Sequence, residues 1–212
     1  MVSALAELLK TTRRMVELDL VRGTSGNISI RQETTLYITP SGLPYDKMDE
    51  SSISVIDLRT GEQTGGTHRP SSEVFLHTKI YQTRTDVSAI VHTHSLYATM
   101  FAVCRRPIRA IHYIIAQIGN EIPVAEYATY GTQTLAENVV HALGQNFGVL
   151  MANHGVVCVG DTLARALERA VTVEYCAELS WGAQQLGSPV VLDSQEMQRV
   201  STKFQTYGPQ KF

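Results

Sequence analysis

Hydrophobic and polar positions along the chain follow two periods, which predict strands and helices in turn. Short apolar or alternating runs that end in turn residues predict strands at 27–31, 35–42, 52–61, 89–94, 122–128 and 148–160, the last broken at 153–155. Apolar residues at helical spacing predict helices at 1–20, 71–84, 95–104, 131–145, 161–187 and 193–208. Because strands and helices are interleaved and several strands are adjacent in sequence, we expect an α/β layered domain whose central mixed, largely antiparallel sheet is flanked by helices.

Capping residues refine two helix boundaries. The helix at 71–84 is expected to open at Ser71 or Ser72, and the long helix at 161–187 to have Asp161 as its N-cap and Gly187 near its end. No long Pro/Gly/Ser linker, low-complexity tract or internal repeat interrupts the sequence. Residues 1–212 are therefore expected to form a single domain.

The composition is that of an ordinary globular chain without a marked charge. Its 212 residues are 43% hydrophobic and 18% charged, the formal net charge is −2, and Lys and Arg form no cluster. This balance argues against nucleic acid or a membrane surface as partner, but allows a local anion pocket. No apolar run approaches the roughly 18 residues that span a bilayer, and the charged residues at helical spacing in 1–20 do not suit a secretory signal.

The cysteines are odd in number and widely spaced, at Cys104, Cys158 and Cys176, with no C-x-x-C pair. A disulfide framework or a thiolate zinc site is therefore not expected. A reducing cytoplasm fits this cysteine usage.

A pair of histidines ends the predicted strand 89–94. His92 and His94 are separated by one residue, and side chains of a strand alternate between its faces, so both imidazoles point the same way. Two neutral imidazoles on one face suit a divalent metal. The alternative is a polar strand end with two half-exposed histidines.

A third imidazole could come from the break at 153–155. His154 lies there between two apolar runs and directly before Gly155. Three histidines suit a catalytic zinc that keeps one coordination position open. The alternative is a core histidine whose ring is hydrogen-bonded to the backbone.

The segment "RPSSEVFLH" offers two candidates for a fourth ligand. Glu73 is expected in the first turn of its helix, where the macrodipole favours a carboxylate. Taken by itself, it is better explained as a capping residue than as a metal ligand. His77 follows four residues later, on the same helix face. From the residues alone, Glu73 and His77 compete for the site at His92 and His94.

Three short polar segments lie at 23–27, 39–42 and 71–72, and each offers hydroxyls, glycine backbone amides, or both. Each alone is more typical of a turn, and none is a Walker loop, because the lysine and the spacing are missing. Together they could bind a phosphate without lysine or arginine, with the helix start at 71–72 adding free amides.

These motifs occur in an order that resembles a known family. G-T-S-G-N, T-P-S-G, S-S-E, H-x-H, N-H-G and the terminal F-x-T-Y-G follow one another as in the class II sugar-phosphate aldolases, within the aldolase and ribulose-phosphate 4-epimerase superfamily. "SGLPYDKM", "AIHYIIAQIG" and "EYATYGT" are also similar to that family. The resemblance runs from about residue 20 to the tail.

The resemblance implies a zinc site and a phosphate site. His92, His94 and His154 match the histidines that bind one Zn²⁺ per chain. Glu73 matches a carboxylate that binds zinc at rest and acts as the catalytic acid/base, whereas the counterpart of His77 is not a ligand. The phosphate-binding groups of the family match Gly26, Asn27, Ser41, Gly42, Ser71 and Ser72.

The resemblance also implies an assembly. Tyr113 matches a catalytic tyrosine that reaches a neighbouring subunit's site, and Tyr207 matches a tail tyrosine that closes over the substrate. Family members of this kind are homotetramers with sites between subunits. Two departures are Ser25, where alanine is usual, and the ending "YGPQKF", whose closing segment differs.

The implied reaction is the zinc-dependent, reversible cleavage of a ketose 1-phosphate, such as L-fuculose 1-phosphate, to dihydroxyacetone phosphate and an aldehyde. A salvage aldolase acting on 5-deoxyribulose 1-phosphate or 5-methylthioribulose 1-phosphate shares every catalytic part. A ribulose-phosphate 4-epimerase is less favoured, because epimerase relatives typically have Asp where Glu73 stands. A metal-binding scaffold without chemistry is disfavoured, since all matching polar positions are intact.

Overall fold

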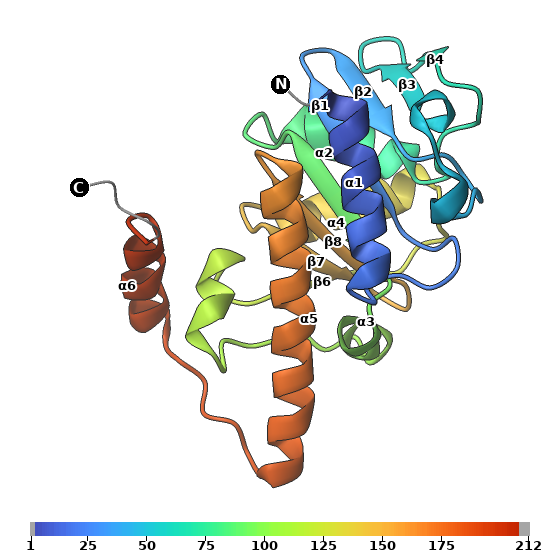
Figure 1. Cartoon of the computed structure of the whole chain (residues 1–212). Coiled ribbons are helices and arrows are strands. Elements are labelled where there is room, and N and C mark those ends of the chain that lie inside the picture. The colour runs from blue at the N-terminus through green and yellow to red at the C-terminus, as the bar shows by residue number, and fades with distance from the viewer. Residues whose placement is uncertain (1–2, 208–212) are drawn as a thin grey trace.

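One eight-stranded sheet forms the centre of the molecule (Figure 1). The computed structural model describes residues 3–207. The strands lie in the order β4-β3-β2-β1-β5-β8-β7-β6, and every neighbouring pair is antiparallel except β6 and β7. Their bounds are β1 Asn27–Gln32, β2 Thr35–Ile38, β3 Ser54–Asp57, β4 Gln63–Gly65, β5 Ala89–Thr93, β6 Val124–Ala125, β7 Gly148–Met151 and β8 Gly155–Gly160.

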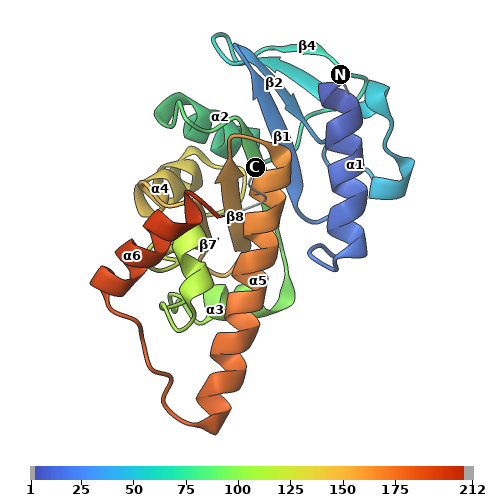
Figure 2. The same cartoon turned by 60° about the vertical axis from the view of Figure 1, so that its left-hand side comes forward.

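Helices cover both faces of this sheet, as Figures 1 and 2 show from two sides. α1, α3 and α5 pack on one face, and α2 and α4 pack together on the other. The helices are α1 Ala4–Glu17, α2 Val74–Thr83, α3 Leu96–Val103, α4 Gln133–Leu143, α5 Leu163–Leu186 and α6 Ser194–Phe204, with short 3₁₀ turns at η1 Tyr45–Lys47, η2 Glu50–Ser52 and η3 Tyr113–Gln117. The predicted fold class, a layered α/β domain with a mixed, largely antiparallel sheet, is confirmed.

Strand alternation divides the core into two layers. Along β5, Val91 belongs to the apolar cluster under α1, α3 and α5, whereas Ile90 belongs to the cluster under α2 and α4. His92 has the same parity as Ile90, so its ring lies on the α2 side of the sheet. The face that receives the histidines is thus set by the pleat of a fully buried strand.

Two helices begin later than their sequence indicates. α2 begins at Val74, not at Ser71 or Ser72, because the Val74 amide donates to the Ser71 carbonyl and a tight turn precedes the helix. Glu73 is consequently the N-cap residue instead of a first-turn residue. The N-cap of α5 is Thr162 instead of Asp161, since the Thr162 hydroxyl accepts from the Arg165 amide.

Several short elements were not predicted. β4 and the three 3₁₀ turns have too few residues for a periodic pattern, and the expected strand 122–128 is reduced to Val124–Ala125. The segment 148–160 forms the expected pair of strands, with its break at 152–154 as the hairpin turn. The end of the predicted last helix, like the rest of 208–212, lies outside the described residues, so a domain spanning all of 1–212 stays a prediction.

The junction between β5 and α3 is fixed from a distance. The carboxylate of Glu174, on α5, accepts hydrogen bonds from the amides of Tyr97 (2.8 Å) and Ala98 (2.9 Å) in the first turn of α3. The N-cap residue Ser95 makes no such bond. Glu174 therefore caps α3 and fixes the chain directly after the two histidines.

Within residues 3–207, no helix combines the length and apolar character needed to cross a bilayer.

Candidate active site

Three histidines meet at the end of the sheet. His92 is in β5 and His94 follows it on the same face, while His154 is in the turn between the neighbouring strands β7 and β8. Asn153 adopts a positive φ of 55° in that turn, a conformation that asparagine tolerates better than most residues. The antiparallel pairing of β5 with β8 then places the three rings side by side, with centroids 4.8–5.0 Å apart.

The ring nitrogens are arranged as metal ligands would be. One nitrogen of each ring lies within 4.8 Å of the others, and the Nε2 atoms of His92 and His94 are 3.0 Å apart. Ligand atoms of a tetrahedral zinc with bonds of about 2.0–2.1 Å are roughly 3.3 Å apart. The Nδ1–H of His92 donates to the Val156 carbonyl at 2.9 Å, which leaves Nε2 as the ring nitrogen that faces the cluster. The donor set therefore fits a divalent metal.

Glu73 completes this cluster from the α2 side. Its Oε2 lies 3.0 Å from Nε2 of His92, and its Oε1 lies 3.4 Å from Nε2 of His154. The carboxylate is buried, and Oε1 has no hydrogen bond in the described part of the chain. A buried carboxylate oxygen without a hydrogen bond, facing imidazoles, is a second observation that fits a cation at this point.

The pKa values describe two neutral imidazoles and a third, His92, that is paired with a charged carboxylate. Burial by itself would lower the pKa of His92, but the charge and hydrogen bond of Glu73 raise it above its ordinary value. Burial lowers the pKa of His94 to about 3 and that of His154 to about 4, and the His92 ring adds to both shifts. Burial by itself would raise the pKa of Glu73, but His92, His154 and Asn27 bring it below its ordinary value. Two imidazoles are thus in the unprotonated state that metal binding requires, beside an ionised carboxylate.

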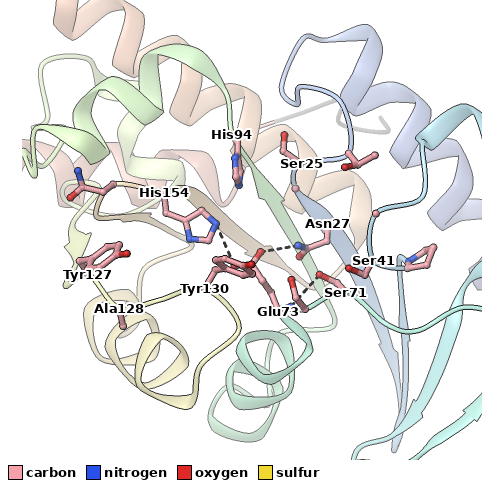
Figure 3. A pocket seen from close by; sticks show the side chains of 16 residues that line it. Ser25, Asn27, Ser41, Ser71, Glu73, His94, Tyr127, Ala128, Tyr130 and His154 are labelled. Carbon is pink, nitrogen blue, oxygen red and sulfur yellow. Dashed lines mark hydrogen bonds and ion pairs between the residues drawn. The ribbon is translucent and has the colours of Figure 1, made fainter.

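A polar cleft of about 330 Å³ opens beside the histidines (Figure 3). In the close-up, His154 and Tyr127 lie on the left and Ser41 and Ser71 on the right. The predicted site residues that line it are Gly26, Asn27, Ser41, Gly42, Ser71, Ser72, Glu73, His94 and His154. His92 is fully buried behind them. Among residues 3–207, the side chains that line the cleft include no lysine or arginine.

The turn before β1 needs its glycine. Gly26 has a φ of +76°, and a Cβ added there would lie 2.7 Å from the His92 carbonyl oxygen. Only glycine lets this turn approach the histidine strand so closely. On the facing side, the Ser71 hydroxyl accepts from the Glu73 amide at 3.2 Å. The polar segments and the histidine cluster are therefore parts of one cleft.

Other residues reach the cleft that the sequence did not single out. Tyr127, Tyr130 and Asn153 line it, together with Ala128, Thr24, Ser25 and Pro40. Both tyrosines are more than half exposed, at 54% and 66%. The segment "EYATYGT" around these tyrosines is similar to the family, but that resemblance assigned them no role. Exposed aromatic side chains in the loop after β6 could have suggested a binding surface.

Two predicted site residues lie elsewhere. Tyr113 and Tyr207 line a different groove, between η3 and α6, where the Tyr113 ring stacks on Phe204 at 6.1 Å. Tyr113 is 52% exposed and Tyr207 81% exposed. Neither side chain lines the histidine cleft of its own chain. Of the competing residues Glu73 and His77, only Glu73 contacts the histidine cluster.

Residues 6–181 match the sequence pattern of the class II aldolase and adducin N-terminal domain. The chain belongs to this family. An L-fuculose phosphate aldolase from Escherichia coli (strain K12) is 40% identical over 204 residues, which cover 95% of this chain and 94% of that protein. A 5-methylthioribulose-1-phosphate/5-deoxyribulose-1-phosphate aldolase from Rhodospirillum rubrum is 41% identical over 202 residues, which cover 95% of this chain and 90% of that protein.

The fold of this class II aldolase family member is also shared with a solved structure. An L-fuculose 1-phosphate aldolase matches with a TM-score of 0.93 and 42% identity, covering 97% of this chain and 98% of that one. The family resemblance inferred from the ordered motifs is therefore confirmed.

Gly155 lets β8 pack closely against β5, the strand that carries His92. A Cβ at Gly155 would lie 2.4 Å from the Thr93 carbonyl oxygen, 3.0 Å from the His94 ring and 3.3 Å from the His92 ring. Gly155→Ala should lower the free energy of unfolding by about 1–3 kcal/mol, as overpacking does, and weaken Zn²⁺ binding because the strands must separate. Denaturant unfolding and calorimetric Zn²⁺ titration measure the two effects.

Gly182→Ala is the matched control, since nothing lies within 4 Å of an added Cβ there. It lies inside α5, where alanine is favoured over glycine, so stability should be unchanged or slightly raised. If Gly155→Ala has the same free energy of unfolding and the same Zn²⁺ affinity as the parent, the close packing of these strands is not needed for the cluster.

Proposed function

We propose that this chain is a zinc-dependent aldolase that reversibly cleaves a ketose 1-phosphate, L-fuculose 1-phosphate or a similar sugar, to dihydroxyacetone phosphate and an aldehyde. One observation supports this above all: the three imidazoles and the buried carboxylate of Glu73 border the same cleft as the serine and glycine segments. Metal ligands, a proton-transferring group and an anion-binding surface are thus within reach of one small substrate. The family match and the aldolase relatives support the same reading.

The phosphate end is assigned to the serine and glycine side of the cleft. Gly26, Asn27, Ser41, Gly42, Ser71 and Ser72 would bind it through hydroxyl, amide and backbone N–H groups, close to the start of α2. Because the described lining residues include no lysine or arginine, these groups would hold the phosphate by dipoles and hydrogen bonds. This leaves the carbonyl and hydroxyl oxygens of the sugar facing the histidines.

The metal end is assigned to His92, His94 and His154, with Glu73 as the fourth group. A zinc ion bound there supplies a Lewis acid that stabilises negative charge on the substrate oxygens. The proton of the C4 hydroxyl would pass, by way of the Tyr113 hydroxyl of a neighbouring subunit, to solvent. The C3–C4 bond breaks as the C4 carbonyl forms, and the bonding electrons pass toward C2 as an enediolate. Glu73 then returns a proton to C3, which yields dihydroxyacetone phosphate. No lysine is required for a Schiff base.

We infer a homotetramer with shared sites, as the family resemblance implies, and the position of the two tyrosines supports it. Tyr113 and Tyr207 are exposed in the groove between η3 and α6, and neither lines the histidine cleft of its own chain. We infer that Tyr113 acts on the aldehyde oxygen in the site of a neighbouring subunit, and that Tyr207 covers that substrate. The assembly would work in the reducing cytoplasm, consistent with the widely spaced cysteines of the sequence.

The aldehyde portion of the substrate is the less defined part of this proposal. Relatives named for L-fuculose phosphate and for 5-methylthioribulose and 5-deoxyribulose phosphates are about equally similar to this chain, at 40–41% identity. Their names share the ketose phosphate end and differ in the remainder of the sugar. A salvage aldolase is therefore the second candidate, ahead of a 4-epimerase.

A panel of ketose 1-phosphates tests the proposed reaction. We expect release of dihydroxyacetone phosphate, measured by coupled reduction, from L-fuculose 1-phosphate or from the 5-deoxy- or 5-methylthioribulose esters. Activity should disappear with a chelator and return with Zn²⁺, and elemental analysis should find about one metal per chain. A protein without transition metal whose activity ignores chelators would refute the zinc assignment. Epimerisation of a ribulose phosphate without aldehyde release would instead favour the epimerase.

Substitutions at the cluster separate metal binding from proton transfer. Glu73→Gln keeps three imidazoles and should retain much of the metal, yet lose the proton transfer that commonly contributes about 10²–10⁴-fold to the rate. His92→Ala should lose metal and activity together, because it removes a ligand from a buried cluster. Turnover and metal content are measured on the same samples. Turnover of Glu73→Gln at the parental rate would exclude Glu73 as the acid/base.

Subunit mixing tests whether sites are shared. Tyr113→Phe should reduce turnover strongly and leave zinc content and tetramer mass unchanged, since the ring is exposed and remains able to stack on Phe204. Mixing this variant with Glu73→Gln chains under subunit exchange should restore part of the activity, because some sites then combine an intact Glu73 with an intact Tyr113. Activity no greater than the sum of the two variants, after verified exchange, would mean that each site is built within one chain.

A further inference from the structure

A buried row of polar side chains extends from Glu73 into the core, away from the cleft. Glu73, His77 and Tyr81 follow at four-residue spacing along α2 and its N-cap, and Asn27 and Ser29 follow at two-residue spacing along β1. All five residues are buried, none more than 5% exposed. Four helical residues rise about 6.0 Å and two strand residues about 6.6 Å, so the two series stay in register over this length. We call this set the polar ladder.

Hydrogen bonds join the polar ladder from end to end, alternating between helix and strand. Asn27 Nδ2 lies 2.8 Å from Glu73 Oε2, and Asn27 Oδ1 lies 2.6 Å from His77 Nε2. His77 Nδ1 lies 2.6 Å from the Ser29 hydroxyl, which lies 2.8 Å from the Tyr81 hydroxyl. Tyr81 is also 3.1 Å from the Ser29 carbonyl.

Chemistry allows one direction for these bonds. An ionised carboxylate only accepts, so the Asn27 amide must turn its NH₂ group toward Glu73 and its oxygen toward His77. His77 must therefore donate from Nε2, which leaves Nδ1 as the acceptor for the Ser29 hydroxyl proton. Tyr81 then donates to one of the two Ser29 oxygens. Each donor points toward the carboxylate.

We propose that His77 is a positioning residue for Glu73: its Nε2–H holds the Asn27 amide in the orientation that donates to the carboxylate. An amide nitrogen has two hydrogens, and Asn27 also lines the cleft, so the second hydrogen is available to a bound anion. If the amide turned over, its oxygen would face both the carboxylate and the anion. His77 thereby orients the Asn27 amide, which serves both Glu73 and the phosphate end of the cleft.

The surroundings of His77 support a fixed, neutral ring. Its side chain is fully buried, and burial lowers its pKa to about 3, an effect that the charge of Glu73 only partly opposes. Burial likewise raises the pKa of Tyr81, so its hydroxyl stays a donor. The ring is therefore neutral, and both of its nitrogens are engaged in hydrogen bonds.

The first experiment examines the metal-free protein and does not depend on activity. With ¹⁵N-labelled histidine and asparagine, NMR should show the His77 proton on Nε2 and not on Nδ1. The Asn27 NH₂ signals should be shifted and slow to exchange in the parent. His77→Gln, which keeps a terminal donor, should preserve these Asn27 signals, and His77→Leu should lose them. A proton on Nδ1, or Asn27 signals that are alike in the Leu and Gln variants, would overturn the proposal.

The second experiment rests on the proposed aldolase function. His77→Leu should lower kcat about 10–100-fold, the usual effect of removing a residue that orients a metal ligand, with zinc content unchanged, and His77→Gln should recover most of the loss. Ile80→Ala is the matched control, because Ile80 is fully buried on the same helix and takes no part in the polar ladder. A kcat for His77→Leu equal to that of Ile80→Ala would reduce His77 to a packing role.

The two experiments distinguish failure of the inference from failure of the function. If the parent cleaves no ketose 1-phosphate, the proposed function fails, and the NMR measurements on metal-free protein still decide whether His77 orients Asn27. If His77→Leu does not fold, the proton position in the parent and the Asn27 signals of His77→Gln decide it.

Discussion

A carboxylate buried at the end of a sheet is the constraint around which this site is organised. Removing an ionised carboxylate from water costs several kcal/mol unless other groups compensate it. Glu73 receives that compensation from His92 on β5, from His154 in the β7–β8 turn and from Asn27 on β1. These partners come from segments far apart in the sequence. The ends of four elements must therefore meet at one point.

The order of the strands provides this meeting point. β5 lies between β1 and β8, so the residues beside His92 are Asn27 on one side and Val157 on the other. Gly26 and Gly155 have no side chains to keep the adjoining backbone away from the histidine strand. Beyond the sheet, Glu174 caps α3 and fixes the chain directly after His94. The geometry of the cluster thus depends on backbone packing and on one helix-to-helix contact as much as on the ligands.

The cleft and the groove between η3 and α6 differ in character. The cleft is lined mainly by small polar residues, histidines and two tyrosines. The groove has more aromatic and aliphatic side chains, with Tyr113, Phe204 and Tyr207 in a row of ring contacts. α6 packs on η3 and lies apart from the sheet, as Figure 1 shows. An exposed aromatic surface of this kind supports the proposal of a shared site, in which a neighbouring subunit would cover the cleft.

Much of this architecture could be predicted from local patterns. Alternation along "AIVHTH" indicated that His92 and His94 share a face, the break at "ANHGV" indicated a turn that presents His154, and ordered motifs indicated the family. Periodicity reports the geometry of one element, because it depends only on the pleat or pitch of that element. It did not reveal β4, the true start of α2, or the part of the cleft formed by Tyr127 and Tyr130. Nor could it separate Glu73 from His77 without the family, since both lie on one helix face. Only the tertiary structure decides between Glu73 and His77. The pairing of β1 with β5 places Asn27 between His77 and the cluster. The partner of a side chain across a sheet depends on which strands become neighbours, and local periodicity carries no information about that.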